Sequence, residues 1–171
     1  MSQKPIAVID ASVVILVGLP PPKLEPKEYA LRRQRATECL RSLHSDGLDF
    51  IVPAPTITEL SRDGNGEELA RKFFARLGGM QVKPFDLPAA LVAAKMLKTA
   101  FASKAAHEAR AAIKYDAMIA AVAHALNAKC LVTANARDFG KYLAEVASPV
   151  ELIAADDVPQ KGQLRLIDRK A

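Results

Sequence analysis

Tryptophan is absent from the sequence, and aromatic residues make up only 5% of it. Because half of the residues are hydrophobic, the core has to be built mainly from alanine, valine, isoleucine and leucine. No apolar run approaches the roughly 20 residues that a membrane-spanning helix needs. The N-terminal apolar stretch is too short, and is interrupted too early, to be a signal peptide. We therefore expect a soluble, cytoplasmic protein with no membrane partner.

Cysteine and histidine are scarce as well. The two cysteines, Cys39 and Cys130, lie far apart in apolar-periodic segments, which favours small buried side chains in a reducing compartment. The three histidines, His44, His107 and His124, have no spacing typical of a zinc site. These patterns disfavour both a disulfide scaffold and a zinc-binding module.

A chain of 171 residues is long enough for one domain with a substantial core. We expect a single domain over residues 1–155, followed by a basic C-terminal tail at 156–171. The net charge of +5 favours an anionic partner, nucleic acid above all, although many basic proteins bind none.

The hydrophobic pattern alternates between strands and helices. A Pro-rich segment, 18–30, is either an ordered excursion or a flexible loop. The helix after Asp86 carries Leu87, Leu91, Ala94 and Phe101 on one stripe. Strands are expected at 5–9, 48–52, 80–85, 129–135 and 148–153, and helices at 28–45, 56–60, 67–79, 87–101, 102–114, 115–128 and 136–143. This order predicts an α/β fold in which helices cover both faces of a central parallel sheet.

Acidic residues follow the strands of this predicted sheet. Asp10 ends the first strand, Glu59 follows the second, and Asp116 opens the helix at 115–128. Asn135 and Asp138 follow the strand at 129–135. The carboxyl ends of parallel strands share one edge of a sheet, so these side chains are expected to meet there. Their mutual repulsion is relieved by a divalent cation with oxygen ligands, Mg²⁺ or alternatively Mn²⁺, which suits phosphodiester hydrolysis.

Each acid also has a purely structural interpretation. Asp10 could bond backbone N–H groups at the end of its strand, and Glu59 could be an acid on a helix surface. Asp116 could be the N-cap of its helix. Asp138 could pair with Arg137 or Lys141, or cap a short helix. The joint placement of Asp10, Glu59 and Asp116 at one edge favours the functional interpretation for these three. For Asp138, the choice between a structural and a functional role is left open.

The segments "VIDASVVI", "PTITEL" and "KYDAMIAAVAHALNAKCLVTANARDF", in this order, resemble the PIN-domain family, most closely its VapC-type toxins. The resemblance covers roughly residues 5–153, and the third segment is the most specific. It implies a PIN-like fold and a Mg²⁺-dependent endoribonuclease. It also implies a homodimer and a small antitoxin protein that obstructs the site.

Carried over by position, the family's catalytic and metal-binding acids correspond to Asp10, Glu59 and Asp116. Ser12 and Thr133 match the hydroxyl residues that position substrate. Many relatives have an acid where this chain has Asn135, so Asp138 is a candidate fourth acid, and Asn135 could position water or phosphate. RNA phosphates are expected to contact six basic residues, Arg32, Arg33, Arg35, Lys104, Arg110 and Lys114.

Three functions follow, in order of preference. The first is the toxin ribonuclease of a toxin–antitoxin pair. The second is a PIN-domain nuclease that processes or repairs RNA outside such a pair. The third is an inactive PIN module that only binds nucleic acid or protein, which only Asn135 supports. The sequence leaves open the RNA that is cut, the number of metal ions and the identity of the antitoxin.

Overall fold

The computed structural model of the chain describes residues 4–18, 26–61, 68, 71, 75, 80–102 and 110–156. Most of the Pro-rich segment, most of the helix expected at 67–79, and residues 103–109 lie outside the described residues, as does the tail beyond Asp156. Among the described residues, no helix is both long enough and apolar enough to cross a membrane.

A five-stranded sheet in the order β3-β2-β1-β4-β5 forms the centre of the molecule, and all of its strand pairs are parallel. This confirms the predicted α/β sheet. Each predicted strand is present. The strands are β1 (Ile6–Ile9), β2 (Asp49–Pro53), β3 (Gln81–Lys83), β4 (Cys130–Thr133) and β5 (Glu151–Ala154).

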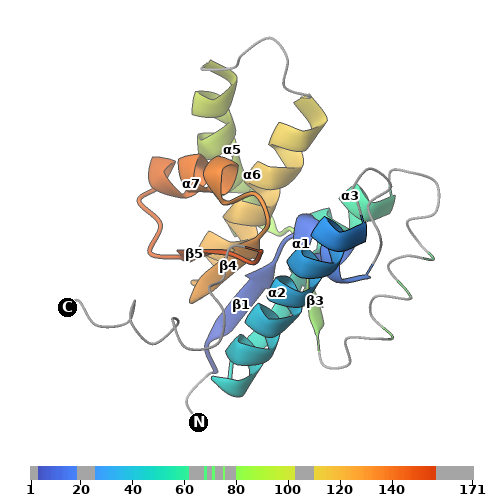
Figure 1. Cartoon of the computed structure of the whole chain (residues 1–171). Helices are drawn as coiled ribbons and strands as arrows, with labels where there is room; N and C mark the ends of the chain where they lie inside the picture. Colours follow the sequence, from blue (N-terminus) through green and yellow to red (C-terminus); the bar gives the residue numbers. More distant parts are fainter. Residues whose placement is uncertain are drawn as a thin grey trace.

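Helices cover both faces of the sheet, and the described helices are α1 (Ala11–Gly18), α2 (Pro26–Ser45), α3 (Ala54–Ser61), α5 (Leu87–Ala102), α6 (Arg110–Ala125) and α7 (Ala136–Glu145). Figure 1 shows α1 and α2 on one side of the sheet and α5, α6 and α7 on the other. Successive residues of β1 point to opposite faces, as strand geometry requires. Ala7 and Ile9 pack into the core under α1 and α2, and Val8 packs into the core under α5 and α6.

The apolar run from Val13 to Val17, next to β1 in sequence, forms helix α1 and not a second strand. Val13, Val14 and Leu16 are buried there. A run this apolar has no periodicity that separates a buried helix from a buried strand, so its type was not predictable from the pattern.

Helix α6 begins at Arg110 and runs without a break through Tyr115. The expectation that Asp116 opens this helix is therefore wrong, and so is its N-cap alternative, because Asp116 lies in the second turn. The sequence Ala111-Ala112-Ile113-Lys114 consists of residues that continue a helix readily, which explains why α6 runs across the expected boundary before Tyr115.

Helix α5 turns a different face to the core than its leucines indicate. Its first turn is capped as expected, since the backbone N–H of Ala89 donates to Asp86 Oδ1 at 3.1 Å. The buried residues, however, are Ala89, Ala93 and Met96. Leu87 and Leu91 of the expected stripe are 71% and 61% exposed. The small alanines let α5 lie close to α6, and they leave an apolar face outside.

Candidate metal centre

Asp10 lies at the carboxyl end of β1, immediately before α1, and is only 3% exposed. Its carboxylate accepts hydrogen bonds from the backbone N–H groups of Ala11, at 2.6 Å, and Ser12, at 3.3 Å. The first turn of α1 therefore directs its N–H groups, and the positive end of its dipole, at this carboxylate. The structural interpretation of Asp10 as an acceptor of backbone N–H bonds is confirmed, and it is compatible with a role in a site.

Two hydroxyls complete the environment of Asp10. Ser12 Oγ donates to Oδ2, and Thr133 Oγ1 donates to the same oxygen at 2.9 Å. Both hydroxyls are themselves held, because the N–H groups of Ala134 and Asn135 donate to Ser12 Oγ and Thr133 Oγ1, each at 2.9 Å. Pairing of β1 with β4 brings Asp10 and Thr133 together. Ser12 and Thr133 thus orient the acid itself.

Burial raises the pKa of the Asp10 carboxyl, and the hydrogen bonds from Ser12, Thr133 and Ala11 act in the opposite direction. Removal from water disfavours the charged form, whereas donors that point at the carboxylate favour it. A nearby cation would favour the charged form further.

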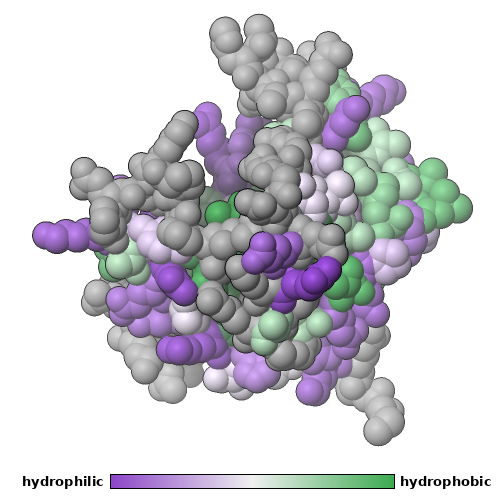
Figure 2. Space-filling model, turned by 90° about the vertical axis from the view of Figure 1, so that its right-hand side faces the viewer, coloured by the Kyte–Doolittle hydropathy of each residue, from purple (hydrophilic) through white to green (hydrophobic). Residues whose placement is uncertain are grey.

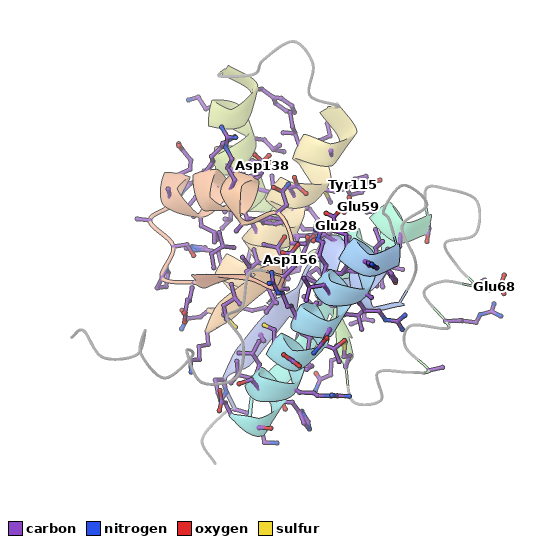
Figure 3. All side chains as sticks on the ribbon, in the orientation of Figure 1. Glu28, Glu59, Glu68, Tyr115, Asp138 and Asp156 are labelled. Carbon is purple, nitrogen blue, oxygen red and sulfur yellow. The ribbon has the colours of Figure 1, made fainter. Side chains whose placement is uncertain are left out.

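Asp10, Glu59 and Asp116 converge at one place. Each offers a carboxylate oxygen, and these oxygens all lie within 4.8 Å of one another. Glu59 comes from α3 and Asp116 from α6, and both are partly buried. Figure 3 labels Glu59, which α3 carries, and Tyr115, the residue before Asp116 on α6. The sequence predicted that these three acids meet at one edge of the sheet, and the structure places them in one cluster.

Three carboxylates at such distances repel one another strongly when all are ionised. Hard oxygen donors in this number suit Mg²⁺ or Mn²⁺, which keep part of their coordination shell for water or phosphate. The donor set therefore fits the cation that the sequence predicts.

Asp138 lies in the first turn of α7 and is not a member of this cluster. It accepts a hydrogen bond from Asn135 Nδ2 at 2.9 Å and pairs with Lys141 Nζ at 3.0 Å. The bond from Asn135, and then that from Lys141, lowers the pKa of the Asp138 carboxyl below its ordinary value. The predicted pairing with Lys141 is thus present.

The described basic residues that were expected to contact RNA come from two helices, α2 and α6. Arg33 on α2 and Lys114 on α6 are exposed. Arg32 instead donates from Nε to Asp156 Oδ2 at 2.7 Å, and Arg35 donates to the backbone carbonyl of Asp156 at 3.3 Å. Lys104 lies outside the described residues, and Arg110 begins α6. The clamp on Asp156, defined here as the contacts of Arg32 and Arg35 with that residue, joins positions over a hundred apart and had no signal in the sequence.

No protein-family model and no curated protein matches the sequence. Solved structures do match the fold. The structure of VapBC2 from Rickettsia felis bound to a DNA fragment from their promoter aligns with a TM-score of 0.53 at 16% identity, over 86% of this chain and 96% of that chain. DNA-bound VapBC from Salmonella typhimurium aligns with a TM-score of 0.55 at 15% identity, over the same shares of both chains.

The chain has a PIN-like α/β fold. The alignment covers nearly the whole length of the neighbouring chains and most of this one. At these identities the similarity concerns the fold, and the chemistry of the site has to be argued from its residues.

Proposed function

We propose that the protein is a Mg²⁺-dependent endoribonuclease, the toxin of a toxin–antitoxin pair, with Asp10, Glu59 and Asp116 as its metal-binding and catalytic acids. The observation that carries this proposal is the convergence of their carboxylate oxygens within 4.8 Å, at the edge of a PIN-like sheet. The inactive-module alternative is disfavoured, because a chain that had lost its chemistry would have no need to keep three repelling acids together.

When bound, the divalent cation lowers the pKa of water and neutralises charge on the scissile phosphate. The protein's own residues then have separate tasks. Asp10 is buried and oriented by Ser12 and Thr133, so it suits a fixed ligand. Glu59 and Asp116 lie on helices and are less buried than Asp10, so either can accept a proton from a water held at the cluster.

The antitoxin partner is part of the same proposal. Both neighbouring structures are VapBC complexes. A search for a small reading frame that overlaps the upstream end of the gene, followed by co-purification of its product, separates a toxin from an RNA-processing or repair nuclease. A homodimer is also proposed, and the exposed leucines of α5 supply an apolar surface for it.

The test of the enzyme is cleavage of single-stranded RNA by the purified protein. Cleavage should require Mg²⁺, stop on chelation and return when Mg²⁺ is restored. Asp116→Asn should lower the rate at least about 100-fold, as loss of a metal ligand or proton acceptor does. The matched control is Glu151→Gln, which neutralises an exposed acid on β5. Full cleavage in the presence of a chelator, or by the folded Asp116→Asn variant, would refute the assignment.

A further inference from the structure

A hollow of about 680 Å³ opens between α3, α6 and the segment just before α5. Its volume lies in the range of ligand-binding pockets. Apolar and aromatic side chains form most of its wall, together with one cation and two hydroxyls. Residues that line it include Pro55, Thr58, Phe85, Lys114, Tyr115 and Met118.

The position of this hollow relates it to the acidic cluster. Thr58 and Tyr115 immediately precede Glu59 and Asp116 in sequence, and each pair is carried by one helix. A phosphate held at the cluster would therefore have its adjoining nucleotide beside the hollow.

The chemistry of the wall fits one such nucleotide. Phe85 and Tyr115 are half-buried, so each is anchored and still presents part of its ring. Aromatic faces stack on unpaired bases and tolerate any base sequence, whereas the hydroxyls of Thr58 and Tyr115 can discriminate between base edges. Lys114 is exposed at the same hollow and supplies positive charge for a phosphate.

We propose that this hollow is a base-binding subsite, which takes the unpaired base next to the scissile phosphate and sets the base preference of cleavage at that position. The inference rests on the proposed function, because it takes the acidic cluster as the place of the scissile phosphate. It extends that function by naming the residues that discriminate between RNA sequences.

A matched pair of threonine variants tests the subsite. Thr58 and Thr37 are both helical, and each hydroxyl donates to the carbonyl four residues earlier, at 3.3 Å for Thr58 and 2.8 Å for Thr37. Thr58→Leu adds bulk to the hollow, whereas Thr37→Leu makes the same change on α2. Phe85→Ala, which removes a stacking ring, is the complementary variant.

The substrate is a single-stranded RNA with a randomised segment, and sequencing of the fragment ends gives the base preference at each position around the cut. Wild type and Thr37→Leu should share a preference at one adjoining position. Thr58→Leu and Phe85→Ala should lower kcat/KM for the preferred base by about 5–100-fold and flatten that preference. If both variants keep the wild-type preference, or if wild type cuts RNA without any base preference, the subsite is overturned.

Crosslinking supplies a readout that is independent of cleavage. RNA substituted with 4-thiouridine is irradiated with the Asp116→Asn variant, and the crosslinked peptide is identified by mass spectrometry. Crosslinks at Phe85, Tyr115 or Met118 support the subsite even if wild type cuts no RNA, which would refute only the nuclease. Crosslinks confined to other segments overturn the subsite while leaving the nuclease intact. Thr58→Leu could instead convert a dimer to a monomer and leave the base preference unchanged. That result would make the hollow a contact with a second copy of the chain and would also overturn the base-binding subsite.

Discussion

The buried carboxylate of Asp10 illustrates how single residues work in this protein. Its Oδ2 atom accepts bonds from Ser12 and Thr133, and backbone groups hold those hydroxyls in turn. A buried acid would cost several kcal/mol without such partners. The same bonds that make burial tolerable also fix the direction in which the carboxylate faces the cluster.

Thr133→Val tests this orienting role, because valine keeps the shape of threonine and removes the donor. Mg²⁺ binding should weaken by roughly 10–100-fold, as with other partners of metal ligands. The free energy of unfolding should fall by about 1–3 kcal/mol, because Asp10 loses a buried bond. A Mg²⁺ titration of cleavage and a urea titration measure the two effects. Thr37→Val is the control, and an unchanged Mg²⁺ midpoint in Thr133→Val would contradict the role.

Asp138 gives the corresponding test for the predicted fourth acid. We expect Asp138→Asn to leave the Mg²⁺ midpoint of cleavage unchanged, since Asp138 pairs with Lys141 outside the acidic cluster. Its side chain is 38% exposed, so the pair should contribute at most about 1 kcal/mol. A clear rise in the Mg²⁺ midpoint would restore Asp138 as a metal-site residue.

The contribution of Asp138 to stability depends on pH, and the sign of this dependence follows from the lowered pKa of its carboxyl. A carboxyl whose folded-state pKa is depressed adds stability above its unfolded pKa, and this contribution disappears as the pH falls through the folded pKa. Wild type should therefore exceed Asp138→Asn in stability near neutral pH, and the two should converge in acid. Urea titrations at several pH values measure the difference.

The two cysteines give a further prediction at the scale of single residues. Burial raises the pKa of the Cys39 thiol to about 11 and that of Cys130 to about 12. Only the thiolate reacts readily with thiol reagents. The native protein should therefore resist modification by a disulfide reagent at pH 8, and both thiols should react once urea unfolds the chain. Rapid reaction of two thiols in the native protein would contradict their burial.

Among the elements, α2 is tied to the end of β5 by the clamp on Asp156. Arg32 pairs with a carboxylate that is only 14% exposed, which makes the contact less screened than a surface pair. The clamp holds the N-terminal half of α2 near the edge of the sheet where the acidic cluster lies. An arginine that was expected to contact RNA thus has a structural partner.

Arg32→Ala should lower the free energy of unfolding by about 1–2 kcal/mol, because it leaves a part-buried carboxylate without its charged partner. Arg33→Ala is the matched control. Arg33 is exposed, and its guanidinium lies 6.0 Å from the Tyr29 ring. Urea titration compares the two, and salt-dependent RNA binding by Arg33→Ala separately tests the predicted phosphate contact. Equal free energies of unfolding for the two variants would show that the clamp on Asp156 does not stabilise the fold.

At the scale of the whole molecule, the exposed face of α5 bears on assembly. Leu87, Leu91 and Phe101 repeat on one side of the helix and are 71%, 61% and 40% exposed. Figure 2 shows green hydrophobic residues on the right of that view. Large apolar side chains exposed together on one side of a helix favour a protein contact.

If α5 forms the homodimer, Leu91→Arg should shift the protein to a monomer in light scattering after size-exclusion chromatography. Lys129→Glu, at an exposed position just before β4, is the control for altered charge. The cost of burying an unpaired charge in an interface is large enough to dissociate a dimer of moderate affinity. A dimer that survives Leu91→Arg would place the interface elsewhere.

The alternation of strands and helices along the chain, the parallel sheet and the three acids of the cluster were predictable from the sequence, whereas the order of the strands within the sheet was not predicted. Apolar strands alternate with helical segments in the chain, and acids stand where strands end. These signals are local, and the rule that parallel strands share a carboxyl edge turns them into a spatial prediction. Asp10 and Glu59 could therefore be assigned to one edge, whereas Asp116 was assigned to that edge through a helix start that the structure does not have.

Only the tertiary structure shows which face of a helix is buried and which distant segments are in contact. The leucines of α5 predicted its core face, yet alanines face the core, because close packing against α6 favours small side chains. Ser12 and Thr133 bond Asp10 because β1 pairs with β4, and Arg32 reaches Asp156 because α2 lies near the end of β5. Contacts between distant segments depend on the geometry of the folded chain, which the local pattern of residues does not encode.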